Sequence, residues 1–210
     1  MSQSHSPLQI LLLAAGQSVR MGAENKLLMP YGRKTMVRHI AEQLVKAKIG
    51  DVTVVTGYDA RSVTDQVSNL KIKVCFNPDY EAGQMSSVRT GIQSLPLPLS
   101  GTMIVLADMP ALGLRDYRFL AAQFQRQSCK KILIPYYAEK RGNPIIIPGS
   151  LVPEICTGDL NAGCKKLVDS HPDKITKVAV TNSAFISDVD TASDYEQINR
   201  RTMLPHAICC

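Results

Sequence analysis

Long hydrophobic runs and aromatic side chains are both scarce in this 210-residue sequence. No apolar stretch approaches the roughly 20 residues of a membrane-spanning helix, so no membrane span is expected. The first residues lack the basic segment and cleavage site of a signal peptide, and we therefore expect a cytoplasmic protein. Only 5 % of the residues are aromatic, and the net charge of +6 is not gathered into a basic arm. A nucleic-acid-binding protein more often has a basic stripe with interleaved aromatics, so small phosphorylated substrates are favoured over nucleic acid.

Cysteines at metal-binding or redox spacing are also absent. The six cysteines include no Cys-x-x-Cys pair, which argues against a zinc or redox site. We expect most of them to be small core residues in a reducing compartment. With 45 % hydrophobic and 20 % charged residues, the composition excludes a disordered, collagenous or coiled-coil chain.

Short apolar runs alternate regularly with amphipathic stretches. Buried strands are predicted at residues 10–13, 52–56, 72–76, 103–107, 132–135, 143–148, 175–180 and 185–189. Helices are predicted at residues 35–47, 59–67, 85–95, 115–127, 149–156, 162–169 and 192–200. This order predicts a single Rossmann-like α/β domain, with a mostly parallel sheet flanked by helices. The domain is expected to span residues 8–202, between a flexible N-terminal segment at 1–7 and a C-terminal tail at 203–210.

The first polar segment follows the first predicted strand. Residues 13–22 read Leu-Ala-Ala-Gly-Gln-Ser-Val-Arg-Met-Gly, and Lys26 comes shortly after. In a parallel sheet, ligands bind beyond the carboxyl ends of the strands, and small residues there let the backbone approach a ligand closely. Arg20 and Lys26 would offer positive charge to phosphates. The segment is neither a P-loop nor a G-x-G-x-x-G motif, and a tight turn with two solvated cations explains its spacing equally well.

Two further loops are candidates for ligand binding. The segment at residues 77–91 contains Gly83, which frees the backbone, and Ser86 or Ser87, which would open a helix with unpaired N–H donors. An ordinary serine N-cap is the plain alternative. The segment Arg141-Gly142-Asn143-Pro144 opens another strand, and a simple turn would account for it.

Acidic residues follow two of the predicted strands. Asp108 comes after the strand at 103–107, where a carboxylate is well placed to hold a metal near a phosphate, although a turn aspartate is the common alternative. Asp188 and Asp190 would point to the same side of the strand at 185–189 and so join Asp108 over one metal ion. The alternative is that Asp190 or Thr191 caps the last helix.

The pattern Ala-Ala-Gly-x-Ser-x-Arg-Met-Gly…Lys resembles the signature loop of nucleotidyltransferases that join a nucleotide to a phosphorylated acceptor. The chain is most similar to the molybdenum cofactor cytidylyltransferases and their guanylyltransferase relatives, from the first predicted strand to the last helix. The guanylyltransferases usually carry Leu-Ala-Gly-Gly, whereas this chain has Ala14-Ala15-Gly16, which favours CTP. The resemblance implies nucleotide binding by Leu13, Ala14, Ala15, Gly16, Arg20, Lys26, Gly83 and Ser87, with Arg20 and Lys26 on the phosphates.

The same resemblance assigns a metal and an acceptor side. Asp108 matches the Mg²⁺ ligand of the Gly-Asp-x-Pro pattern, although Ala107 replaces the glycine. Asp190 matches Asp-[Ile/Val]-Asp-Thr-Pro as the second ligand, with Asp188 in reserve and Ala192 where proline is usual. Arg20, Lys26 and Asp108 are the expected catalytic residues, and the acceptor-binding residues are Arg141, Gly142 and Asn143.

The reaction implied by this resemblance is Mg²⁺-dependent transfer of CMP from CTP to the phosphate of molybdopterin or the molybdenum cofactor. The cytosine dinucleotide cofactor would serve molybdenum hydroxylases, with a transient contact to such an enzyme. Because a phosphate monoester has a second pKa near ~6, the acceptor is already ionised and needs no general base. The alternatives are a GTP-dependent guanylyltransferase, a nucleotidyltransferase for a sugar or polyol phosphate, and a non-catalytic carrier of the cofactor.

Overall fold

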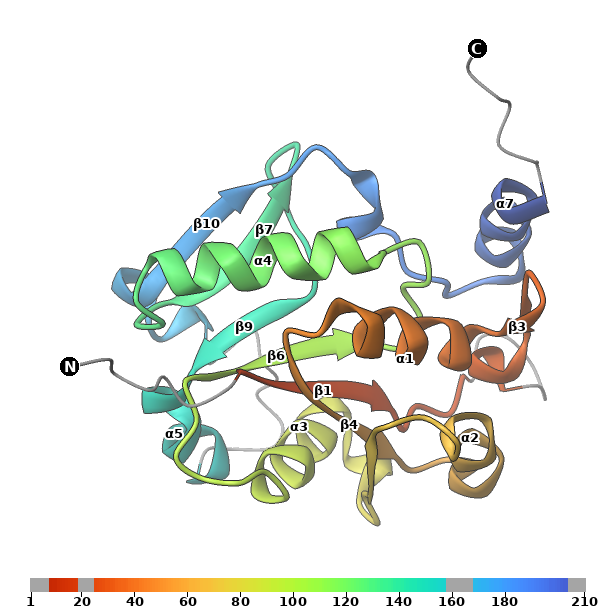
Figure 1. Ribbon diagram of the computed structural model, residues 1–210, viewed down its shortest axis with the longest axis horizontal. Helices are drawn as coiled ribbons and strands as arrows, with labels where there is room; N and C mark the ends of the chain where they lie inside the picture. Colours follow the sequence, from red (N-terminus) through yellow and green to blue (C-terminus); the bar gives the residue numbers. More distant parts are fainter. Residues whose placement is uncertain (1–7, 19–24, 158–167, 204–210) are drawn as a thin grey trace.

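The computed structural model describes residues 8–18, 25–157 and 168–203. Arg20, the N-terminal segment expected at 1–7, and most of the helix expected at 162–169 lie outside these residues. Of the C-terminal tail expected at 203–210, only Met203 is described, as the last residue of a helix. The main sheet contains eight strands: β1 (Leu8–Ala14), β4 (Gly50–Thr56), β5 (Lys73–Phe76), β6 (Gly101–Leu106), β7 (Ile132–Tyr137), β8 (Lys140–Arg141), β9 (Ile145–Pro148) and β10 (Ile175–Ala179). Their order is β10-β7-β9-β6-β1-β4-β5, with β8 paired to β7 (Figure 1). A small hairpin pairs β2 (Pro30–Tyr31) with β3 (Lys34–Thr35).

Helices cover both faces of this sheet (Figure 1). They are α1 (Met36–Ala47), α2 (Ala60–Val67), α3 (Gln84–Gln93), α4 (Leu114–Arg126), α5 (Val152–Thr157) and α7 (Ala192–Met203). The 3₁₀ turns are η2 (Lys26–Leu28), η3 (Tyr80–Ala82), η4 (Gly149–Leu151), η6 (Pro172–Lys174) and η7 (Ser183–Ile186). Because side chains alternate along β1, Ile10 and Leu12 pack with α1, α2 and α4, whereas Leu11 and Leu13 pack with α3 and α5. The apolar run of β1 is thus buried on both faces, as in a covered parallel sheet.

The predicted, mostly parallel sheet is confirmed. Strand β1 runs parallel to β4 and β6, β4 to β5, and β7 to β10, while β9 is antiparallel to both β6 and β7. The carboxyl ends of β1 and β6 therefore lie at one edge, on the right of Figure 1. Since β9 runs the other way, with Ile145 opposite Ile104, its first residues start at that same edge. We call it the carboxyl edge of the sheet.

The strand predicted at residues 185–189 is wrong. The chain there forms the 3₁₀ turn η7, followed by an extended segment outside the named strands. The side chain of Asn182 accepts a hydrogen bond from Ala184 N and so starts the turn. Val189 N donates to Asp108 O at 2.9 Å, which attaches the segment to the end of β6 through a bond outside any strand ladder. The expected alternation of Asp188 and Asp190 on one face of a strand therefore does not apply.

Helix α1 carries a charged cluster on its outer side. Glu42 accepts hydrogen bonds from the ammonium group of Lys34 and from Nε of Arg38, the latter at 2.8 Å. These two hydrogen bonds lower the pKa of Glu42 to about 2.

Within the described ranges, no helix is both long and apolar enough to cross a membrane.

Candidate functional site

A pocket of about 360 Å³ opens at the carboxyl edge of the sheet. Its walls come from the loop after β1, the turn η3, the start of α3 and the end of β6. Seven of the predicted site residues line it: Leu13, Ala15, Gly16, Lys26, Gly83, Ser87 and Asp108. The strand ends are joined by backbone hydrogen bonds beyond the ladders, from Ala107 N to Leu13 O and from Tyr58 N to Ala15 O, both at 3.1 Å.

Five other predicted residues do not line this pocket. Ala14 is buried in the core on the α1 side of the sheet. Asp190 reaches the site through Lys26, as described below. Arg141 ends β8, and Gly142 and Asn143 lie in the turn between β8 and β9. Gly142 N donates to Pro135 O and Asn143 N to Phe185 O, both at 2.8 Å, so this turn is held against η7.

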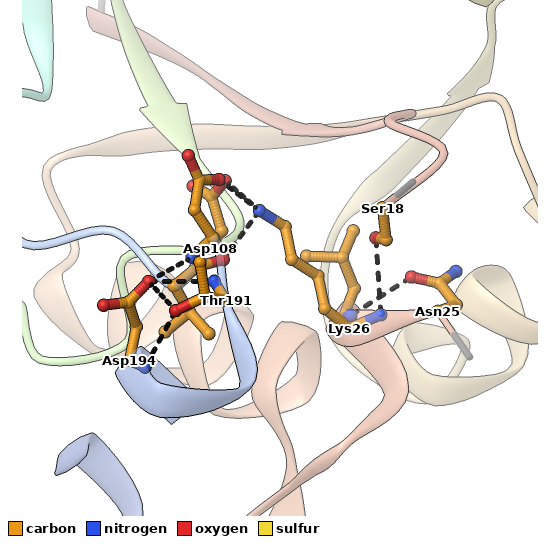
Figure 2. Close-up of polar contacts among 9 residues, drawn as sticks. Ser18, Asn25, Lys26, Asp108, Thr191 and Asp194 are labelled. Carbon is orange, nitrogen blue, oxygen red and sulfur yellow. Dashed lines mark hydrogen bonds and ion pairs between the residues drawn. The ribbon is translucent and has the colours of Figure 1, made fainter. Parts of the chain in front are cut away.

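Lys26 connects three separate parts of the chain (Figure 2). Its Nζ lies 2.8 Å from Oδ2 of Asp108, 3.1 Å from Oδ1 of Asp190 and 2.7 Å from the carbonyl oxygen of Val189. The Lys26 side chain is only 12 % exposed. The two carboxylates stand 82 and 164 residues away from the lysine in sequence, and the fold brings all three charges together.

The backbone beneath Lys26 is held by local polar contacts. Lys26 N donates to Oγ of Ser18 at 3.3 Å, which ties the two ends of the loop together. The Asn25 side chain accepts a hydrogen bond from Leu27 N at 3.1 Å and caps the turn η2. Figure 2 shows these contacts on the backbone side of Lys26, away from the carboxylates. The position of the Lys26 backbone is thus set independently of its ammonium group.

The last helix is capped by Thr191 and Asp194 and not by Asp190. Asp194 N donates to Oγ1 of Thr191 at 3.2 Å, and Oδ2 of Asp194 accepts from Thr191 N at 2.8 Å and from Thr191 Oγ1 at 2.7 Å. This reciprocal arrangement is a capping box. Of the two alternatives in the sequence, Thr191 takes the capping role, and the carboxylate of Asp190 pairs with Lys26.

Electrostatics hold this cluster of charges together. Burial alone would lower the pKa of Lys26, but the charge of Asp108 and the hydrogen bonds to Asp108 and Asp190 outweigh it and raise that pKa above its usual value. Burial raises the pKa of Asp188, and the nearby negative charges of Asp190 and Asp108 add to this effect. Oδ1 of Asp108 is buried and has no hydrogen-bond partner among the described residues. A buried carboxylate oxygen in this state is available to a cation.

Asn77 organises the opposite wall of the pocket, a role that its place in the sequence did not indicate. Its side chain is completely buried. Nδ2 donates to the hydroxyls of Ser86 at 2.8 Å and Ser87 at 3.0 Å. Helix α3 begins at Gln84, with Gly83 as N-cap residue, so the two serines belong to its first turn and neither is the N-cap. The predicted strand-to-helix loop is present, but the serine hydroxyls face Asn77.

Tyr80 and Glu81 also line the pocket without having been predicted. A side chain at Gly57 would place its Cβ 2.5 Å from Cβ of Tyr80 and 2.9 Å from Cβ of Ala15, so only glycine allows this close packing. Gln17 Nε2 donates to Oε1 of Glu81 at 3.0 Å and bridges the β1 loop and η3. The position of Tyr80 and Glu81 in the loop before Gly83 was the available signal in the sequence.

Comparisons with known proteins agree with this architecture. Rv0371c from Mycobacterium tuberculosis H37Rv has a similar structure, with a TM-score of 0.82 and 23 % identity over 94 % of this chain and 99 % of that one. A structure of Rv0371c in complex with manganese has a TM-score of 0.77 at 21 % identity, over 93 % of this chain and 99 % of that one. These similarities support the same α/β nucleotidyltransferase fold.

Two curated proteins are similar in sequence over most of the chain. Nicotine blue oxidoreductase from Paenarthrobacter nicotinovorans is 25 % identical over 86 % of this chain and 91 % of its own length. A probable molybdenum cofactor guanylyltransferase from Methanosarcina mazei is 25 % identical over 73 % of this chain and 69 % of its own length. The family model described as the MobA-like NTP transferase domain matches residues 10–175, from β1 to the start of β10. The chain therefore belongs to the family of MobA-like NTP transferases.

Proposed function

We propose that this protein transfers CMP from CTP to the phosphate of molybdopterin or the molybdenum cofactor. The observation that carries the proposal is the convergence of Lys26, Asp108 and Asp190 beside a pocket at the carboxyl edge of the sheet. Family membership supports the reaction class. The similar probable molybdenum cofactor guanylyltransferase supports the acceptor, and the sequence Ala14-Ala15-Gly16 favours CTP over GTP.

The proposed metal ligands are Asp108 and Asp190. Both carboxylates already face one cation, the Lys26 ammonium group, and the second oxygen of Asp108 is buried without a partner among the described residues. Mg²⁺ commonly takes one or two protein carboxylates and completes its shell with substrate phosphates and water, so this donor set fits. When bound, such an ion would supply charge neutralisation at the reacting phosphate. The manganese complex of Rv0371c supports a divalent ion.

The remaining roles concern positioning. We assign Lys26 and Arg20 to the triphosphate, and Leu13, Ala15, Gly16, Gly83 and Ser87 to the nucleoside. An acceptor phosphate oxygen then attacks the α-phosphorus of CTP, the new P–O bond forms, and the bond to the bridging oxygen breaks with release of pyrophosphate. The acceptor is ionised near neutral pH, so catalysis consists of in-line alignment and charge neutralisation. We place Arg141, Gly142 and Asn143 on the acceptor side, because their turn is bonded to η7, which precedes Asp190.

The test is pyrophosphate release by the purified protein with Mg²⁺ and molybdopterin, offering CTP, GTP, ATP and UTP separately. Release with CTP alone is the expected result. Asp108→Asn should lower turnover by about 100-fold or more, a typical loss when one charge-stabilising group is removed. Asp51→Asn is the matched control, because Asp51 is an exposed aspartate near the amino end of β4.

Each other outcome points to a different function. Preference for GTP would keep the reaction and reverse the choice of base, and activity only with a sugar or polyol phosphate would reverse the choice of acceptor. Tight pterin binding without turnover would support the non-catalytic carrier of the cofactor.

The similarity to nicotine blue oxidoreductase supports an oxidoreductase as second candidate. Decolourisation of nicotine blue, with reduced nicotinamide or flavin nucleotides as reductants, would favour that candidate. We further propose a transient contact with a molybdenum hydroxylase, which co-purification with such an enzyme would test.

A further inference from the structure

The ammonium group of Lys26 is fully engaged by the protein itself. A lysine ammonium has three N–H donors, and three acceptors surround this one: Asp108 Oδ2, Asp190 Oδ1 and Val189 O, at 2.7 to 3.1 Å. The side chain is largely shielded from water. Lys26 thus occupies the point at which the two proposed metal ligands meet.

This arrangement conflicts with the roles proposed for the same residues during catalysis. A divalent ion held by Asp108 and Asp190 would lie close to the Lys26 ammonium group, and two cations at such short distance repel each other strongly. Lys26 cannot contact a triphosphate without giving up at least one of its three acceptors. The ligand-free protein and the loaded protein therefore require different positions of this side chain.

We propose that Lys26 is an internal counter-cation that keeps divalent metal off Asp108 and Asp190 until a nucleoside triphosphate draws its ammonium group away. The inference rests on the proposed function, since it takes the metal and triphosphate roles from there. It adds that the metal and the nucleotide load together, and that Lys26 couples their binding. Such coupling is reciprocal: each ligand tightens the binding of the other by the same factor.

The local structure allows the side chain to move while the backbone stays in place. The contacts of Ser18 and Asn25 hold the backbone at Lys26 and Leu27, and neither involves the ammonium group. Lysine has a flexible four-carbon stem, and Lys26 already lines the pocket. A change of side-chain rotamer is therefore enough to carry the charge from the carboxylates into the pocket.

Binding of Mn²⁺, followed by the electron paramagnetic resonance signal of the free ion, tests the proposal. The unsubstituted protein should bind Mn²⁺ weakly alone and more tightly with a non-hydrolysable CTP analogue. Lys26→Met should bind Mn²⁺ alone at least about tenfold more tightly than the unsubstituted protein, because no ammonium group has to be displaced. Lys34→Met is the matched control, since it also removes one lysine charge, but from the exposed pair with Glu42, and should match the unsubstituted protein.

Measurements at a second salt concentration distinguish a direct effect of the Lys26 ammonium group on the two carboxylates from a long-range effect of its charge. The tightening by Lys26→Met should persist between about 0.15 M and about 0.5 M KCl, because partly buried pairs are screened much less than exposed charges. Equal Mn²⁺ binding by Lys26→Met and the unsubstituted protein would overturn the inference, and so would a tightening that disappears at the higher salt concentration. In both cases, loss of Mn²⁺ binding in Asp108→Asn would leave the proposed function standing. If no Mn²⁺ bound to the unsubstituted protein even with the analogue, the proposed function itself would fail.

The unsubstituted protein provides a measurement that does not depend on how the variant folds. Nitrogen-15 NMR of lysine ammonium groups should show a Lys26 signal protected from exchange with water in the ligand-free protein. Adding Mg²⁺ with the CTP analogue should shift that signal, while the signal of Lys34 stays unchanged. A Lys26 signal that does not move on loading would overturn the inference.

Discussion

Replacing Asn77 with alanine is expected to destabilise the protein and to weaken nucleotide binding at once. The buried side chain donates to Ser86 and Ser87, and its Oδ1 accepts from Asp79 N at 3.0 Å and from Thr90 Oγ1 at 3.2 Å. Each such hydrogen bond contributes about 0.5 to 1.5 kcal/mol net. With four bonds lost and part of the loss recovered by rearrangement, we expect Asn77→Ala to lower the free energy of unfolding by about 3 kcal/mol.

The functional part of this prediction follows from Ser87, which lines the pocket. Without Asn77, its hydroxyl loses the donor that orients it, while Ser86 keeps its own bond to Gly83 O at 2.8 Å. KM for the nucleotide should therefore rise more than kcat falls, because the altered groups lie on the pocket wall and apart from the Lys26 cluster.

Urea unfolding followed by circular dichroism measures the first effect, and nucleotide titration measures the second. Thr90→Val is the matched control: it removes one of the four bonds and should cost about 0.5 to 1.5 kcal/mol. An Asn77→Ala protein within about 1 kcal/mol of the unsubstituted one would show that these contacts contribute little and would refute the estimate. Unchanged nucleotide affinity would refute the positioning of Ser87.

Three further predictions concern other parts of the structure. Gly57→Ala should displace Tyr80 from the pocket wall, because the new Cβ would lie 2.5 Å from that side chain, and isothermal titration should detect weaker nucleotide binding; an unchanged affinity contradicts this. Gly83→Ala should destabilise the protein by about 1 to 3 kcal/mol in urea, because Gly83 has φ +95°, whereas Gly16→Ala, with open space and no left-handed φ, should change stability by less than 0.5 kcal/mol or so. The folded-state pKa of Glu42, about 2, lies below its ordinary value of 4.5, so its stabilising effect is complete above that ordinary value and is lost as the pH falls toward 2. The stability difference between the unsubstituted protein and Glu42→Gln should shrink over that range in acid titrations of the urea midpoint, and a constant difference would contradict it.

The fold could be predicted from local patterns, because the hydrophobic period that marks a buried strand or an amphipathic helix is contained in a short stretch of sequence. The strands that are buried on both faces of the sheet were visible as short apolar runs, and the amphipathic helices α1 and α4 as apolar residues at helical spacing. The prediction failed at residues 185–189, where the apolar Phe185, Ile186 and Val189 resemble a strand. Phe185 is buried in the turn η7 and Val189 in the segment that follows it, and hydrophobic period alone cannot distinguish this from a strand.

The candidate site was likewise predicted only in part. The sequence by itself indicated polar segments after the predicted strands, with Lys26, Gly83 and Asp108 among them, and the family resemblance added Ser87 and Asp190. The sequence could not show that Lys26 contacts Asp108 and Asp190, because these contacts join residues 82 and 164 positions apart, and no local period carries such information.

The tertiary structure alone decided the roles of Asn77 and Tyr80, and it chose Thr191 over Asp190 as the cap of the last helix. In the sequence, Asn77 is an ordinary loop amide, Tyr80 an ordinary loop aromatic and Thr191 a helix cap. Only the description of Thr191 holds in the structure. Asn77 and Tyr80 acquire their roles from chain segments that pack against them, the first turn of α3 and the glycine after β4. A sequence specifies the chemistry that a side chain offers and the face on which it lies, whereas its partner depends on how distant elements meet when their apolar faces are buried.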